Sequence, residues 1–97
     1  IVREERLAAE AEQACDAGDP AGCTALGKAY LYGAGRPQSR PIADILLREG
    51  CAADQAEACH EVGNLLVEAE DEAAYRYGLE ALDRACRLGR LDACSDY

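Results

Sequence analysis

The chain has 97 residues and a mass of 10.3 kDa, which allows one compact domain or a few stacked repeats and excludes a large multidomain enzyme. Its 10 basic and 19 acidic residues give a formal net charge of -9, which would repel a phosphate backbone or an anionic membrane surface. No stretch approaches the roughly 18 apolar residues of a membrane span. We therefore expect neither a nucleic-acid partner nor membrane insertion.

The composition favours helices, because the chain contains five Tyr but no Phe, Trp or Met, and its apolar residues are mostly Ala and Leu. The first helix is expected from about residue 3 to residue 17, ending at Gly18. Asp19 and Pro20 supply an N-cap and a first-turn proline for a second helix that reaches about Tyr32.

A loop follows over residues 33–37, whose sequence Gly-Ala-Gly-Arg-Pro cannot easily continue a helix. Ser39 is the expected N-cap of a third helix, which should end near Gly50. Asp54 is the expected N-cap of a fourth helix, from about residue 55 to residue 68.

The fifth helix is expected from about Asp71 to Leu88, with Gly89 closing it. Only three residues follow Cys94, too few to complete a sixth helix, so we expect either a truncated array or a partner that covers the exposed end. Because the chain starts at Ile1 without a Met or an apolar signal segment, we expect a mature or trimmed form.

The cysteines reveal an internal repeat. They form three pairs with an identical separation of eight residues, and the first members of successive pairs lie 36 and 35 residues apart. This period is typical of helical repeat arrays. We therefore predict a single repeat domain over residues 1–97, divided into 3–38, 39–73 and a partial third unit, 74–97.

Other positions follow the same register. Gly27 and Gly63 each lie four residues after the second cysteine of their unit. Ahead of the first cysteine, four columns of mostly small or apolar residues make one helical stripe per unit. The columns are Leu7/Ala43/Gly78, Glu10/Leu46/Ala81, Ala11/Leu47/Leu82 and Ala14/Gly50/Ala85.

The first unit resembles a known family. The run Leu26-Gly27, Tyr30, Gly33 and Gly35 resembles the signature of Sel-one-like repeats, and residues 15–23 resemble the cysteine pair of its secreted, cysteine-rich bacterial branch. The resemblance implies an α/α superhelical solenoid of about two and a half repeats, with one disulfide per repeat. It also implies a periplasmic or secreted protein that binds other proteins. In the second unit the corresponding residues are Leu66, Ala69 and Asp71, so the second inter-repeat loop is expected to differ.

Six cysteines permit fifteen pairings. The first cysteine of each pair falls at the end of one helix and the second at the start of the next, so the two face each other across a tight turn. This predicts the disulfides Cys15–Cys23, Cys51–Cys59 and Cys86–Cys94, each worth about 2.5 kcal/mol in the chain-entropy model.

Metal binding and redox chemistry are the competing interpretations of the cysteines. The spacing is too wide for a usual zinc site and His60 is the only imidazole, so we expect no metal or other cofactor. Cys23 and Cys59 could serve a redox or haem-handling assembly factor because they fall in first helical turns, although no C-x-x-C motif is present.

No catalytic residues are expected. His60, beside Cys59, could act as a base for a thiolate, and the alternative is a solvent-facing helical histidine. Ser39 and Ser95 stand in no nucleophile motif. The family resemblance alone raises a second interpretation, a β-lactam-binding or weakly hydrolytic protein of the cysteine-rich branch.

A protein or peptide partner is the leading hypothesis, without catalysis. Partner contacts are expected in the columns that vary between units, which are Ala8/Asp44/Leu79, Ala9/Ile45/Glu80, Glu12/Arg48/Asp83 and Gln13/Glu49/Arg84. The candidates are Arg48, Glu49, Asp83, Arg84 and the cluster Tyr75-Arg76-Tyr77, since Tyr and Arg are enriched at binding hot spots. The alternative for the tyrosines is that they fill gaps between repeats.

Overall fold

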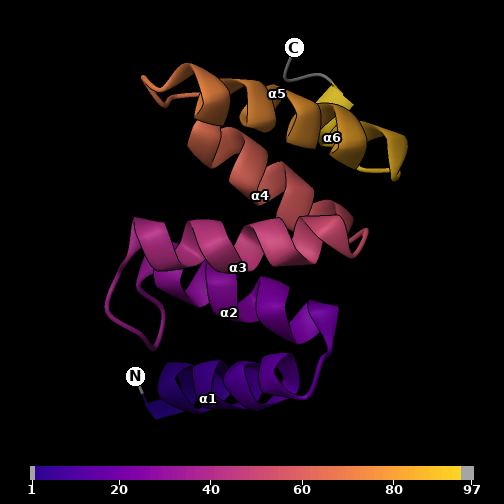
Figure 1. The fold of residues 1–97 in the computed structure, drawn as a ribbon. Coiled ribbons are helices and arrows are strands. Elements are labelled where there is room, and N and C mark those ends of the chain that lie inside the picture. Colours follow the sequence, from indigo (N-terminus) through magenta and orange to yellow (C-terminus); the bar gives the residue numbers. More distant parts are fainter. Residues whose placement is uncertain (1, 95–97) are drawn as a thin grey trace.

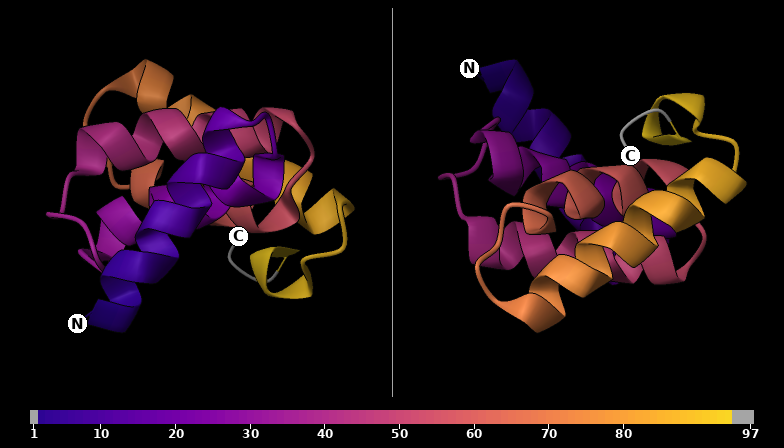
Figure 2. Two further views of the ribbon diagram at one scale, coloured as in Figure 1. Left: turned by 90° about the horizontal axis from the view of Figure 1, so that it is seen from below. Right: turned by 90° about the horizontal axis from the view of Figure 1, so that it is seen from above.

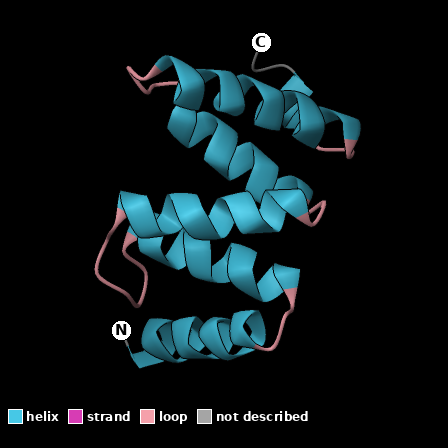
Figure 3. Cartoon of the chain, in the orientation of Figure 1, coloured by secondary structure: helices cyan, strands magenta, loops and turns pink. Residues whose placement is uncertain are grey.

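The computed structural model describes residues 2–94, of which 77% are helical and none form a strand (Figure 3). All-helical architecture is therefore confirmed. The helices are α1 (Val2–Asp16), α2 (Pro20–Tyr32), α3 (Arg40–Ala52), α4 (Ala56–Leu66), α5 (Glu72–Arg87) and α6 (Leu91–Cys94). None of them, within the described residues, is long and apolar enough to cross a membrane.

Each helix packs mainly on its neighbours in the sequence. In Figure 1 the helices follow one another in a zigzag, with α2 between α1 and α3, and α4 between α3 and α5. Figure 2, which views the stack from both ends, shows successive helices crossing over one another. The resulting body measures 37 × 26 × 20 Å.

Three helix starts are as predicted. The Asp19 carboxylate accepts a hydrogen bond from the backbone N–H of Ala21 at 3.1 Å, and Pro20 follows at the first helical position of α2. The Ser39 hydroxyl accepts from the backbone N–H of Ile42 at the start of α3. Asp71 caps α5 in the same way. These side chains satisfy backbone donors that have no partner inside the helix.

The prediction for Asp54 is wrong. Gln55 is the N-cap of α4 and makes no side-chain cap bond, while Asp54 adopts a left-handed conformation with φ 64°. Gly18 and Gly89 hold the corresponding position in the other two helix turns, with φ 92° and 104°. The position therefore requires a left-handed backbone, which Asp tolerates better than most side chains.

Gly50 does not end α3, which continues to Ala52. Gly50 is buried, and a Cβ built there would lie 2.5 Å from the Thr24 hydroxyl and 2.8 Å from the Ala58 methyl. This glycine therefore allows α3 to approach α2 and α4 closely. Helix α4 is also shorter than predicted, because it ends at Leu66.

Each disulfide joins the two helices of one unit. The bonded pairs are Cys15–Cys23, Cys51–Cys59 and Cys86–Cys94, which are the pairs expected from the sequence. Their Cα atoms lie 4.4 to 4.8 Å apart, within the range usual for disulfides. One covalent link therefore closes every helix turn of the three units.

A glycine–leucine contact is repeated between units. A Cβ built on Gly27 of α2 would lie 2.9 Å from the Leu47 side chain of α3, and one built on Gly63 of α4 would lie 2.7 Å from Leu82 of α5. Both leucines are fully or almost fully buried. Each leucine thus fills the space that the missing side chain of the glycine leaves.

We predict that Gly63→Ala lowers the free energy of unfolding by about 1–3 kcal/mol, because the added methyl overpacks the contact with Leu82. At an exposed helical site the same change would stabilise by about 1 kcal/mol, so the sign of the effect is diagnostic. Urea denaturation of Gly63→Ala, Leu82→Ala and the double variant measures the coupling between the two sites. Strictly additive costs, or a stabilising Gly63→Ala, would contradict this packing.

Candidate functional site

Two of the predicted contact residues meet across the boundary between the second and third units. The Arg48 guanidinium of α3 lies 4.3 Å from the centre of the Tyr77 ring of α5, and Asp44 accepts a hydrogen bond from its Nε at 2.7 Å. Burial raises the pKa of Tyr77, and the nearby positive charge of Arg48 opposes that shift. The arginine is therefore held in place by a carboxylate and an aromatic face.

A second contact joins the same two units. The Arg84 guanidinium of α5 donates a hydrogen bond to the carboxylate of Asp54, the residue with the left-handed backbone. Glu49, in the same column as Arg84, lies beside the disulfide of the preceding unit. Glu49 in the second unit and Arg84 in the third unit therefore both face the helix turn of the preceding unit.

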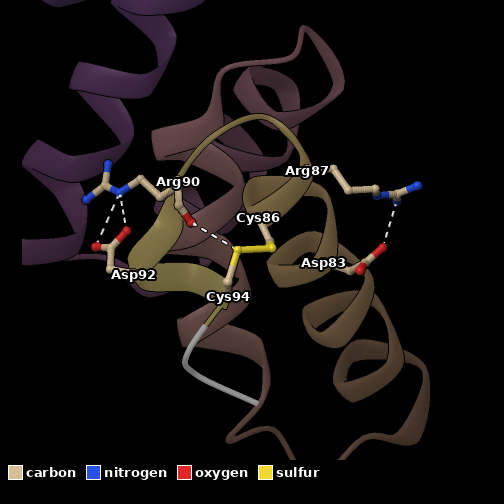
Figure 4. The surroundings of a disulfide bond; sticks show 6 residues. All are labelled: Asp83, Cys86, Arg87, Arg90, Asp92 and Cys94. Carbon is tan, nitrogen blue, oxygen red and sulfur yellow. Dashed lines mark hydrogen bonds and ion pairs between the residues drawn. A yellow bond between two sulfur atoms is a disulfide. The ribbon is translucent and has the colours of Figure 1, made fainter.

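A shallow groove of about 540 Å³ runs along α5. We call it the α5 groove, and its lining residues are Leu79, Glu80, Asp83, Arg84 and Arg87. Two of the predicted contact residues, Asp83 and Arg84, belong to it. Asp83 and Arg87 form an ion pair at 2.9 Å along the helix (Figure 4).

Sequence reasoning named only part of this groove. Leu79 and Glu80 lie in the variable columns but were not candidates, and Arg87 lies outside them. The available signal was helical spacing, because residues three and four positions from Asp83 and Arg84 share their face. Leu79 supplies apolar surface between the charged side chains, as in many protein-binding sites.

Tyr75, Arg76 and Tyr77 do not form one cluster. Tyr77 faces Arg48, whereas Arg76 is exposed and pairs with Glu72 of its own helix at 3.2 Å. Tyr75 is also exposed. Adjacent residues in a helix point about 100° apart, so neighbours in sequence diverge on the surface. The expected aromatic and cationic cluster is instead an Arg48–Tyr77 pair between two helices.

His60 is not solvent-facing, which corrects one of the two interpretations of this residue. Its side chain is only 12% exposed and lies 3.8 Å from Asp92 and 3.2 Å from the Asn64 amide. Arg90 donates to Asp92 (Figure 4), and this hydrogen bond lowers the Asp92 pKa. Because the Cys59 sulfur is in a disulfide, His60 has no thiolate to activate in this structure.

The other polar candidates have structural surroundings. A carboxylate oxygen of Glu49 and the sulfurs of Cys15 and Cys23 lie within 4.8 Å of one another, a grouping that could hold a metal ion. The two sulfurs are bonded to each other, and the metal-binding form of cysteine is the thiolate. Ser39 caps a helix, and Ser95 lies outside the described residues.

Neither the protein-family models nor the curated proteins contain a match to this chain.

A further set of contacts links α2 to α4. The Lys28 ammonium donates to Glu57 and the Tyr32 hydroxyl donates to Glu61, both at 2.6 Å. The hydrogen bond to Glu61, with smaller effects of burial and of the charge of Glu61, raises the pKa of Tyr32 to about 12. The carboxylate stabilises the protonated phenol because only that form can donate a hydrogen bond.

We predict that Glu61→Gln lowers the Tyr32 pKa from about 12 towards 10. Since the folded-state pKa is raised, the stabilisation by this bond is fully present below pH of about 10 and is lost as the pH rises towards 12. An ultraviolet absorbance titration of the tyrosines measures the shift, and the difference between wild type and Tyr32→Phe isolates this residue. An unchanged Tyr32 titration in Glu61→Gln would contradict the assignment.

The three disulfides differ in burial, and we predict that they differ in reactivity. Cys51 and Cys59 are 3% and 0% exposed, whereas Cys15, Cys86 and Cys94 are partly exposed. Access controls thiol–disulfide exchange. A limiting amount of dithiol should therefore reduce Cys51–Cys59 last, as measured by alkylation and peptide mapping. In denaturant, which serves as the control, the three disulfides should be reduced at similar rates. Reduction of Cys51–Cys59 before the other two in the native protein would refute this order.

Proposed function

We propose that this chain is a Sel-one-like repeat protein of the cysteine-rich branch, an α/α solenoid of about two and a half units that binds a protein or peptide and performs no chemistry. In this proposal it acts in the periplasm or outside a bacterial cell. The repeated cysteine pairs and the motif of the first unit motivate the family, and the contacts between units support the solenoid.

The solenoid is supported by contacts with a constant offset. Lys28 with Glu57 and Tyr32 with Glu61 join α2 to α4, and each pair is 29 residues apart in sequence. Arg48 of α3 and Tyr77 of α5 are also 29 residues apart. A constant offset between equivalent helices is what a regular translation from unit to unit produces.

Export is supported by the disulfides. All six cysteines are paired, and none of them is free. Disulfides of this kind persist in oxidising compartments and are rare in the cytosol of most organisms. The small, alanine-rich core gives them a stabilising role, since a short chain buries limited apolar area.

One observation carries the proposed binding role. Residues that repeat between units, such as Leu47 and Leu82, are buried, whereas residues that vary line the α5 groove. The Arg84 side chain in the groove is held by its contact with Asp54 of the preceding unit, so less conformational entropy would be lost when it contacts a ligand. The groove carries two arginines and two carboxylates beside Leu79, so it suits a peptide with apolar side chains and charges of both signs.

The test is site-specific photocrosslinking. A photoreactive phenylalanine analogue replaces Leu79 in the α5 groove, and in a matched control it replaces Leu91, which is 77% exposed and lies outside the groove. Exposed to the exported proteins of its source organism, the Leu79 variant should yield a reproducible adduct that the Leu91 variant does not.

The adduct should also depend on Arg84, one of the two arginines of the groove. Adding Arg84→Ala to the Leu79 variant should reduce its yield several-fold, whereas adding Arg76→Ala should not, because Arg76 is exposed outside the groove. Identical products from the two labelled positions, or a yield insensitive to Arg84, would argue against this binding site.

A further inference from the structure

Residues of α1 and α2 line a second groove. Helix α1 lies at the opposite end of the helix stack from α6 (Figure 1). The groove has a volume of about 280 Å³, and we call it the α1–α2 groove. Its lining includes Glu4, Leu7, Ala11, Ala25, Lys28 and Ala29. Leu7 is 54% exposed, although its counterparts Ala43 and Gly78 in the next two units are buried. The groove thus exposes a surface that the other units cover.

The repeat identifies what covers this surface elsewhere. Moving 36 residues along the chain takes Leu7 and Ala11 of α1 to Ala43 and Leu47 of α3. Leu47 packs against Gly27 of α2, so in the second unit the equivalent surface is occupied by a helix. In the third unit, α4 packs on α5 in the same way, through Gly63. The α1–α2 groove is therefore a position at which a helix can lie.

Its shape differs from the two covered surfaces. Ala11 stands where Leu47 and Leu82 stand, so the groove lacks the side chain that fills the space above Gly27 and Gly63. A helix with glycine at that point would leave a void, whereas a bulky apolar side chain would fill it. Helices α2 and α4 have glycine at that point, so α2 or α4 of a second copy of the chain would fit the groove poorly.

Its charge differs as well. Helix α1 carries five acidic residues and two basic ones. Glu10 of α1 is the counterpart of Leu46 of α3. The Cβ of Leu46 lies 3.3 Å from a Cβ built on Gly27 of the helix that covers α3. Glu10 would therefore lie close to the equivalent residue of a helix bound in the groove. Glu4 lies at the edge of the groove, and the Lys28 ammonium is already paired with Glu57. A complementary helix must therefore carry basic residues.

We propose that the α1–α2 groove binds a basic amphipathic helix of a partner protein. A bulky apolar residue of that helix occupies the position that Gly27 and Gly63 hold in the covered interfaces, and lysines or arginines beside it reach Glu10 and Glu4. This is helix-in-groove recognition on a surface separate from the α5 groove.

The test uses a synthetic amphipathic helix with a leucine face and lysines on both flanks, labelled for fluorescence anisotropy. It should bind the full chain saturably, whereas the same helix with glutamates in place of lysines, and the peptide of residues 20–32, should not. Ala11→Leu, which restores the side chain of the covered units, and Glu10→Lys should each weaken binding by about tenfold or more.

Matched variants separate this site from others. Ala9→Leu makes the same change on an exposed part of α1 outside the groove, and Glu70→Lys makes the same charge change on a distant turn; both should leave the affinity within about twofold. Arg84→Ala, which alters the α5 groove, should also leave the affinity for the synthetic helix unchanged. The result therefore does not depend on whether the α5 groove binds a partner. Absent binding, equal binding of the acidic helix, insensitivity to Ala11→Leu, or self-association in sedimentation that Ala11→Leu abolishes would each overturn the proposal.

Discussion

The contact between a glycine on one helix and a leucine on the next fixes the distance between successive units. At Gly27 and Gly63 the missing side chain lets α3 and α5 approach until Leu47 and Leu82 are buried. The contacts at the periphery depend on that close approach because their side chains span short gaps. They include the Lys28–Glu57 ion pair and the Tyr32–Glu61 hydrogen bond between α2 and α4, and the Arg48–Tyr77 contact. A core without Phe, Trp or Met achieves its packing by bringing backbones together rather than by using large side chains.

The helices and the disulfide pairing were largely predictable because their signals are local. Asp19, Ser39 and the eight-residue cysteine spacing act within a few residues of where they stand, and the structure has the caps and bridges that they predict. Asp54 and Gly50 were misinterpreted because each has a common local role, cap or terminator, that the neighbouring helices override. Comparison with Gly18 and Gly89 would have identified Asp54, since all three hold the same place in the repeat.

The candidate site was predictable only in part, because it depends on contacts between units. The variable columns include Asp83 and Arg84, which line the α5 groove, but the sequence did not indicate that Arg48 reaches Tyr77 or that Arg84 reaches Asp54. Such pairs depend on the offset between helices, which is set by packing and not by neighbouring residues. The empty surface on α1 became evident only when it was compared with its covered counterparts.

The placement of the disulfides has a mechanical consequence. Every bridge lies within a unit and none joins one unit to another, so the backbone is a series of small covalent rings connected by segments without cross-links. A stretching force applied to the chain is therefore borne between rings by side-chain packing alone, while the backbone inside each ring cannot extend. Under tension the units would separate from one another, and each helix turn that carries a bridge would stay closed.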